Sequence, residues 1–199
     1  MTRTVRSFIA VELPTEAKEA LSLVTMHLRH AKVKAIRTTD PDVLHLTLKF
    51  LGDVTPEQLA RVAAGARTVS QSFEPFSIKL GGVGIFPNRR SPRVFWVGIR
   101  GALNSLRDLQ NGIEQSMSEL GFPTEKQAFT PHLTIARLRG DSPPKELRRA
   151  TAALCDAPPI SGIPIAVESV SLIHSILTPR GARYSRLTIF PLGTRTPYF

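Results

Sequence analysis

Two short histidine motifs carry the residues of this sequence whose types and spacing could do chemistry. Thr47 follows His45 by two positions, and Thr134 follows His132 in the same way, 87 positions further along the chain. If each motif is a β-strand, alternation places its histidine and threonine on one face, roughly 6 to 7 Å apart. That spacing lets an imidazole reach a reacting oxygen while the hydroxyl holds a neighbouring phosphoryl oxygen. The motifs therefore favour chemistry at phosphorus.

Two histidines can serve both sides of an in-line displacement at phosphorus. The attacking and leaving oxygens lie on opposite sides, so one side needs a general base and the other a general acid. Imidazole is available in both forms near neutrality, and each histidine could contribute about 10²- to 10⁴-fold. The symmetry of the motifs leaves open which of His45 and His132 is the acid. We expect no metal and no cofactor, because a metal site would need further His or carboxylate ligands.

The other histidines and the cysteine lack the support of a repeated motif. His27 and His30 fall in or just beyond a predicted helix, and His174 falls in a late strand, so structural or surface roles are expected. Cys155, in an Ala-rich helical stretch without a neighbouring base, is interpreted as a packing residue. A single cysteine excludes an intrachain disulfide and favours a cytoplasmic location.

The elements that must position the motifs repeat along the chain. The apolar runs Phe8–Val11 and Phe95–Gly98 each begin 37 positions before a motif histidine and are predicted strands. A helical pattern follows each run, at about 14–28 and 102–120. These strands and helices are predicted to flank each motif in the same order.

A second helix start follows each motif. Thr55 can cap a helix that has Pro56 in its first position, and Gln58 completes a capping box. Ser142 is predicted to be the corresponding cap, 87 residues after Thr55. This shared register predicts an internal duplication, with halves at about 5–92 and 93–191.

Pairs of β segments complete the pattern. They are predicted at 76–86 and 93–100, around a turn at 88–92, and at 165–177 and 183–190, around a turn at 178–181. The glycine-rich stretch 80–84 is interpreted as a bulged strand. We therefore predict one bilobal α+β domain spanning 1–199, with two pseudo-symmetric lobes. Each lobe is expected to be an antiparallel-rich sheet with helices on its outer face, around a central active-site cleft.

Strand alternation makes further assignments within the motifs. Lys49 is predicted to share the face of His45, and Phe50 to share the opposite, packed face. Arg137 is predicted to face away from His132, and it reaches the site only if the strand twists or bulges near its end.

Charge narrows the class of partner. The 26 Lys and Arg residues exceed the 16 Asp and Glu residues and give a net charge of +10, which favours an anionic partner such as RNA, DNA or a nucleotide. A basic surface without a specific partner is the alternative. The first apolar run is cut short by Glu12 and Pro14, so no membrane segment is expected.

Six sequence segments carry a family resemblance: RSFIAVELP at 6–14, LHLTLKFLG at 44–52, GIFP at 84–87, PRVFWVG at 92–98, FTPHLTIAR at 129–137 and GARY at 181–184. With them the chain resembles the RNA 2′,3′-cyclic phosphodiesterases of the LigT type, within the two-histidine phosphoesterase superfamily. The resemblance implies metal-independent opening of an RNA 2′,3′-cyclic phosphate to a 2′-phosphate, and in some relatives 2′,5′ joining of RNA ends. It also implies that His45 donates a proton to the departing 3′ oxygen and that His132 activates water. Thr47, Thr134 and Arg137 would bind the phosphate.

One departure from the family pattern concerns base stacking. Such proteins often carry a tryptophan seven residues before the first motif histidine, where this chain has Thr38. Phe86 or another aromatic residue is then the candidate platform. Three arginines of the 88–93 region are candidates to guide the RNA backbone, with an exposed basic turn as the equal alternative: Arg89, Arg90 and Arg93.

Two functions from different classes follow from these patterns. The first is a monomeric enzyme acting on RNA or a nucleotide with a 2′,3′-cyclic phosphate. The second is a basic RNA-binding module in which the motifs grip phosphate without turnover, recognised by tight, salt-sensitive binding alone.

Overall fold

The computed structural model describes residues 4–178 and 181–193. Its helices are α1 (Thr15–His30), α2 (Pro56–Gln71), α3 (Leu103–Glu119) and α4 (Pro144–Cys155), with a 3₁₀ turn at Pro41–Val43. Its strands are β1 (Val5–Glu12), β2 (Ile36–Thr38), β3 (His45–Val54), β4 (Phe76–Phe86), β5 (Val94–Gly101), β6 (His132–Leu138), β7 (Pro164–Val167), β8 (Ser169–Thr178) and β9 (Gly181–Pro191). The middle of the predicted 178–181 turn, Pro179 and Arg180, lies outside the described residues.

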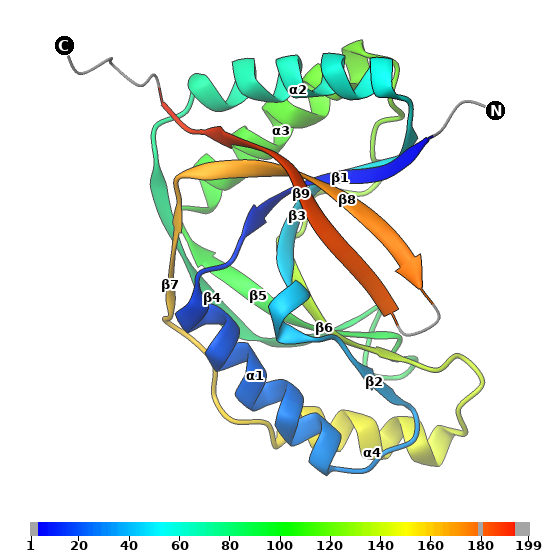
Figure 1. Ribbon diagram of the computed structural model, residues 1–199. Helices are drawn as coiled ribbons and strands as arrows, with labels where there is room; N and C mark the ends of the chain where they lie inside the picture. The colour runs from blue at the N-terminus through cyan, green and yellow to red at the C-terminus, as the bar shows by residue number, and fades with distance from the viewer. Residues whose placement is uncertain (1–3, 179–180, 194–199) are drawn as a thin grey trace.

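The strands form two antiparallel sheets. Sheet A has the order β3-β1-β8-β9, and sheet B has the order β2-β6-β5-β4-β7. Helices α2 and α3 pack on sheet A, while α1 packs on sheet B and is joined there by α4 (Figure 1). The predicted α+β class, with two sheets that each carry helices on one face, is confirmed.

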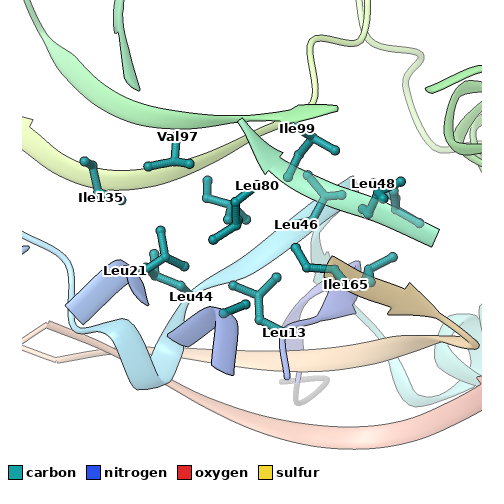
Figure 2. Packing of buried hydrophobic residues seen from close by; sticks show 14 of the residues in the cluster. Leu13, Leu21, Leu44, Leu46, Leu48, Leu80, Val97, Ile99, Ile135 and Ile165 are labelled. Atoms are coloured by element: carbon teal, nitrogen blue, oxygen red, sulfur yellow. The ribbon is translucent and has the colours of Figure 1, made fainter. Parts of the chain in front are cut away.

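One apolar core joins both sheets to their helices. Leu46 and Leu48 of β3 lie close to Leu80 of β4 and Ile99 of β5 (Figure 2). The predicted helical stripes are buried, because residues spaced by three or four positions share one face; those of α1 are Ala17, Leu21, Val24 and Leu28. Each fully buried leucine or isoleucine contributes about 1.5 to 3 kcal/mol, so the core holds the two sheets in a fixed relation.

The halves inferred from the repeat do not coincide with the two sheets. Strand β4 comes from the first half and pairs with β5 in sheet B, whereas β8 and β9 come from the second half and extend β1 in sheet A. Helix α1 follows a strand of sheet A but packs on sheet B. The two halves thus exchange elements, and the duplication itself stays a prediction.

Two boundaries differ from the predicted ones. The segment 165–177 is not one strand, because the chain leaves sheet B after β7 and enters sheet A as β8. Ser142 is not a cap: Pro143 occupies that position and no side chain caps the helix. The Thr55 cap is confirmed, since Thr55 Oγ1 accepts from Gln58 N at 3.3 Å and Gln58 Oε1 accepts from Thr55 N at 3.0 Å. The helix after the second motif therefore starts one residue later than the repeat predicts.

Some smaller features also bear on the predictions. The 80–84 stretch is a bulged strand as predicted, with a register shift between Leu80 and Val83. The prediction that Cys155 is a packing residue is wrong, because this last residue of α4 is exposed. Within 4–178 and 181–193, no helix is both long and apolar enough to cross a membrane.

Candidate active site

Each motif strand contains a β-bulge directly after its motif threonine. On β3, Thr47 pairs with Ala10 and Lys49 pairs with Ile9, which leaves Leu48 without a partner of its own. The same shift occurs on β6, where Thr134 pairs with Trp96 and Ala136 pairs with Phe95, and Ile135 is the extra residue. A bulge inserts one residue and reverses the alternation of the side chains that follow it. The two motifs share this distortion at equivalent positions.

The first bulge turns Lys49 into the core. Lys49 is 2% exposed, and its Nζ donates to Glu114 Oε1 at 2.6 Å and to the carbonyl of Pro123 at 2.5 Å. The prediction that Lys49 shares the face of His45 is therefore wrong. Phe50 moves the opposite way and is 60% exposed, so its predicted packed position is wrong as well.

The second bulge turns Arg137 toward the site. The side chain of Arg137 is exposed, while Ile135 and Ala136 are both buried. Arg137 therefore shares the face of His132 and Thr134. The sequence pattern allowed this only if the strand twists or bulges, and the bulge is present. Each bulge thus places one new residue beside its motif, Phe50 in sheet A and Arg137 in sheet B.

The imidazole of His45 is fixed by its own strand and by aromatic neighbours. Its Nδ1 lies 2.9 Å from the carbonyl oxygen of Val43, and because a carbonyl only accepts, Nδ1 carries the proton of this bond. Its ring stacks on Phe8 at 4.4 Å between centroids and meets the edge of Tyr184 at 5.0 Å. Nε2 has no hydrogen bond within the part of the chain that the structure describes.

The imidazole of His132 is held in the same way. Its Nδ1 lies 2.7 Å from the carbonyl oxygen of Thr130, again two residues earlier. Phe86 meets the ring at 5.0 Å and Trp96 at 6.4 Å, both at steep angles. Nδ1 again carries the proton of this bond, so the two histidines have the same tautomer in their neutral forms.

The two motif strands belong to one site. Strands β3 and β6 contact each other. Burial raises the pKa of Tyr184, and the charges of Arg137 and Arg6 oppose that rise. The charge of Arg137 on sheet B thus acts on the phenol of Tyr184 on sheet A, which itself touches His45. The helix-free faces of both sheets contribute to this site.

Charge distinguishes the two histidines. Burial lowers the pKa of His45, while its bond to Val43 and the negative charge of Glu12 act in the opposite direction. Glu12 lies directly opposite His45 in the β1–β3 ladder, whereas Gly98 lies opposite His132 in the β5–β6 ladder. Of the two histidines, His45 alone has a carboxylate in the facing position.

Glu12 is itself held ionised by a network on the same face. Arg186 binds it through two bonds, Nε to Oε1 at 2.7 Å and Nη2 to Oε2 at 2.8 Å, and Ser171 donates to Oε1 at 2.5 Å. The hydrogen bond from Arg186 is the main reason that the pKa of Glu12 is lowered.

Sequence reasoning did not place three residues of this face at the site, Glu12, Phe50 and Tyr184. Glu12 faces the first motif across the ladder, so the pairing of β1 with β3 would have revealed it. Phe50 required knowledge of the bulge. Tyr184 lies 139 positions after His45 in the chain, and although it ends the GARY segment of the family resemblance, nothing near it in the sequence places it beside His45.

Several other predicted residues lie away from the motif pair. Thr38 Oγ1 accepts from Arg29 Nε of α1 at 2.8 Å, so this side chain points to the helix side of sheet B and offers nothing to a base. Arg89 and Arg90 lie in the exposed 87–93 loop. His27 Nε2 lies 3.0 Å from the carbonyl of Ala153 and links α1 to α4, in keeping with a structural role.

Phe86 does lie beside His132, as noted above, and remains a candidate for base stacking. The described residues contain no group of three or more His, Cys, Asp or Glu side chains that could hold a metal ion.

Comparison with known proteins agrees with this geometry. The family model for LigT-like phosphoesterases matches the chain twice, at residues 11–96 and 97–184. The chain is 32% identical to an RNA 2′,3′-cyclic phosphodiesterase of Methanothermobacter thermautotrophicus over 188 residues, which cover 94% of this chain and 99% of that relative.

Solved structures give the same result. A protein of Thermus thermophilus superposes with a TM-score of 0.78 at 31% identity, and E. coli LigT complexed with 3′-AMP superposes with a TM-score of 0.74 at 28% identity. Each match covers 96% of this chain and 99% of the other. The chain therefore belongs to the LigT-like phosphoesterase family.

Proposed function

We propose that this chain hydrolyses the 2′,3′-cyclic phosphate at RNA ends to a 2′-phosphate, with His45 and His132 as acid and base and without a metal ion. The observation that carries the proposal is the matched placement of the two imidazoles. Each begins its strand, each has Nδ1 bonded to the carbonyl two residues earlier, and each leaves Nε2 available. The names of the relatives, and the 3′-AMP bound to E. coli LigT, support a nucleotide phosphate as the ligand.

The reaction needs two proton transfers. Neutral His132 accepts a proton at Nε2 from water, whose oxygen attacks phosphorus. The bond from phosphorus to the 3′ oxygen breaks, and protonated His45 gives its Nε2 proton to that oxygen. The products are a 2′-phosphate and a 3′-hydroxyl, and proton exchange with solvent restores both imidazoles. When an RNA 5′-hydroxyl replaces water, the same transfers give a 2′,5′ linkage.

The charge around His45 supports its role as the proton donor. A general acid must enter the reaction protonated, and the facing carboxylate of Glu12 favours the imidazolium form. The negative charge of a bound cyclic phosphate favours it further, against the effect of burial. His132 faces Gly98, which carries no charge.

The phosphate is held by three side chains on the same faces. The hydroxyls of Thr47 and Thr134 donate to its non-bridging oxygens, and Arg137 adds a positive charge. Hydrogen bonds from a cation to an anion are roughly twice as strong as neutral ones. An adjacent aromatic ring, Phe86 or the exposed Phe50, stacks on the terminal base.

The test uses RNA that ends in a 2′,3′-cyclic phosphate, with and without EDTA. The wild type is expected to produce only the 2′-phosphate at an unchanged rate in EDTA. His45→Ala and His132→Ala are each expected to lose at least about 10²-fold in kcat, whereas His30→Ala, an exposed histidine at the end of α1, is the control that keeps full activity. Undiminished turnover in either motif variant contradicts the roles assigned here.

Tight, salt-sensitive RNA binding without any turnover would instead establish the RNA-binding module. The monomeric state and the cytoplasmic location remain predictions, and light scattering on the purified protein checks the former.

A further inference from the structure

Two arginines face each other at the edge of sheet B. Arg37 of β2 is the direct cross-strand partner of Arg137 of β6, and β2 is the outermost strand of the sheet. Directly opposed residues have Cα atoms only about 4.5 to 5.5 Å apart, and like charges in this arrangement are destabilising. The fold thus places two cations side by side where most cross-strand partners would be neutral or of opposite charge.

Alternation in β2 decides which way Arg37 points. Thr38 faces the helix side, because its hydroxyl is bonded by Arg29 of α1. Its neighbour Arg37 therefore points to the helix-free side, and its exposure agrees with this direction. Arg37 shares that face with Arg137, its ladder partner, and with His132.

No carboxylate pairs with either guanidinium within residues 4–178 and 181–193. Among the described residues, neither Arg37 nor Arg137 has an ion pair or a side-chain hydrogen bond. The carboxylate identified beside the histidines, Glu12, is already bonded to Arg186. Two opposed cations without an ion-pair partner among the described residues therefore border the site, where they favour an anionic ligand.

We propose that Arg37 binds the phosphodiester on the 5′ side of the terminal nucleotide, so that the site recognises an RNA chain and not only its cyclic end. This inference rests on the proposed function. In a substrate whose cyclic phosphate lies between the two histidines, the only other nearby anion is the phosphodiester that joins the terminal nucleotide to the rest of the chain. Arg137 lies on the same strand as His132, five residues further along β6, and binds the reacting phosphate. Arg37 lies one strand further out, about 4.8 Å away, and is placed for the next phosphate.

The test compares two substrates in one set of variants. One is a mononucleoside 2′,3′-cyclic phosphate, which has no 5′ phosphodiester, and the other is a six-nucleotide RNA ending in the same cyclic group. Arg37→Gln is expected to lower kcat/KM for the RNA on the order of 10-fold, through KM, and to leave the mononucleotide within about twofold. Arg37→Lys keeps the charge and is expected to recover most of the loss. Arg61→Gln removes an exposed arginine from α2 and is the control expected to act on neither substrate.

Salt gives a second readout that a structural role would not move. The slope of log KM against log salt concentration for the RNA is expected to fall by about 0.7 in Arg37→Gln, as for the loss of one phosphate contact to a single strand. The thermal midpoint without RNA is expected to be unchanged or raised, since a like-charge pair is removed.

The outcomes separate the two proposals. If the wild type turns over neither substrate, the proposed function fails. If the wild type turns over both and Arg37→Gln affects neither, or both equally, the phosphodiester contact is overturned while the proposed function stands. An equal loss on both substrates with a lowered thermal midpoint would assign Arg37 a structural role.

Discussion

The substitution Gly84→Ala tests whether the aromatic support of His132 matters to catalysis. Gly84 of β4 lies directly opposite Trp96 of β5, and the indole covers it so closely that an added Cβ would overlap the ring carbons. Trp96 lies 5.0 Å from Phe86 and 6.4 Å from His132, and Phe86 lies 5.0 Å from His132. The methyl group must therefore displace the indole and, with it, the rings that orient His132.

The expected cost follows from the size of this overlap. Forcing an extra methyl group into a packed site typically destabilises a protein by about 1 to 3 kcal/mol. A shift of the order of 1 Å in a catalytic group can lower the rate roughly 10²-fold. Gly84→Ala is thus expected to remain folded, because a domain is usually stable by about 5 to 15 kcal/mol, while its kcat falls by about two orders of magnitude.

A neighbouring glycine supplies the matched control. A Cβ on Gly82, in the same strand, meets nothing within 4 Å, so Gly82→Ala is expected to keep both stability and activity. The assays are urea unfolding and hydrolysis of a mononucleoside 2′,3′-cyclic phosphate, with Gly84→Ala compared with the wild type. A folded Gly84→Ala variant with wild-type kcat would refute the view that these rings position His132.

Three further outcomes are expected. Because burial lowers the pKa of His45 and the acid works only when protonated, the alkaline limb of the kcat/KM profile should lie on the acidic side of an ordinary histidine. Glu12→Gln removes a charge that favours the imidazolium, so it should move that limb to still lower pH, and a shift to higher pH would contradict the argument. Lys49→Met should cost about 3 to 5 kcal/mol of unfolding free energy, since it leaves Glu114 without its buried partner, and Glu114→Gln in the same chain should restore part of the loss in a double-mutant cycle. Cys155→Ser should change neither the thermal midpoint nor the rate, because the thiol is exposed, and a lowered midpoint would return it to a packing role.

The sequence predicted the motif strands and the helices well because their signals are local. An apolar stripe identifies α1, and a Thr-Pro pair identifies the start of α2, from neighbouring residues alone. The cap at Ser142 failed because two prolines follow it, and the helix could begin after either one.

The pairing of the strands was harder to predict than the positions of the strands and helices themselves. The exchange of β4, β8 and β9 between the two sheets depends on contacts across the whole chain, which no window of residues contains. The sequence does not reveal the break between β7 and β8 for a similar reason. Both segments have the residue pattern of a strand, and only the strands with which they pair differ.

The bulges were the most consequential feature that the sequence left undecided. A lysine between Leu48 and Phe50 reads as a solvent-facing residue under strict alternation. Its burial becomes favourable only because Glu114, 65 positions away, and the carbonyl of Pro123 receive its ammonium group. A charge is rarely buried without such partners, and they cannot be identified before the fold is known.

Under the proposed function, the repeated bulge allows two motifs of matching geometry to take different roles. The distortion occurs at the same place in both motifs, so positions 50 and 137 are equivalent and both turn toward the site. The first half places a phenyl ring there and the second half a guanidinium, while the facing strands place Glu12 against His45 and Gly98 against His132. The shared strand geometry thus places the two imidazoles in equivalent positions. The side chains around them make these two positions differ in charge. If His45 is the acid and His132 the base, as proposed, both roles arise from one motif, because the strand geometry is shared while the residues around each histidine differ.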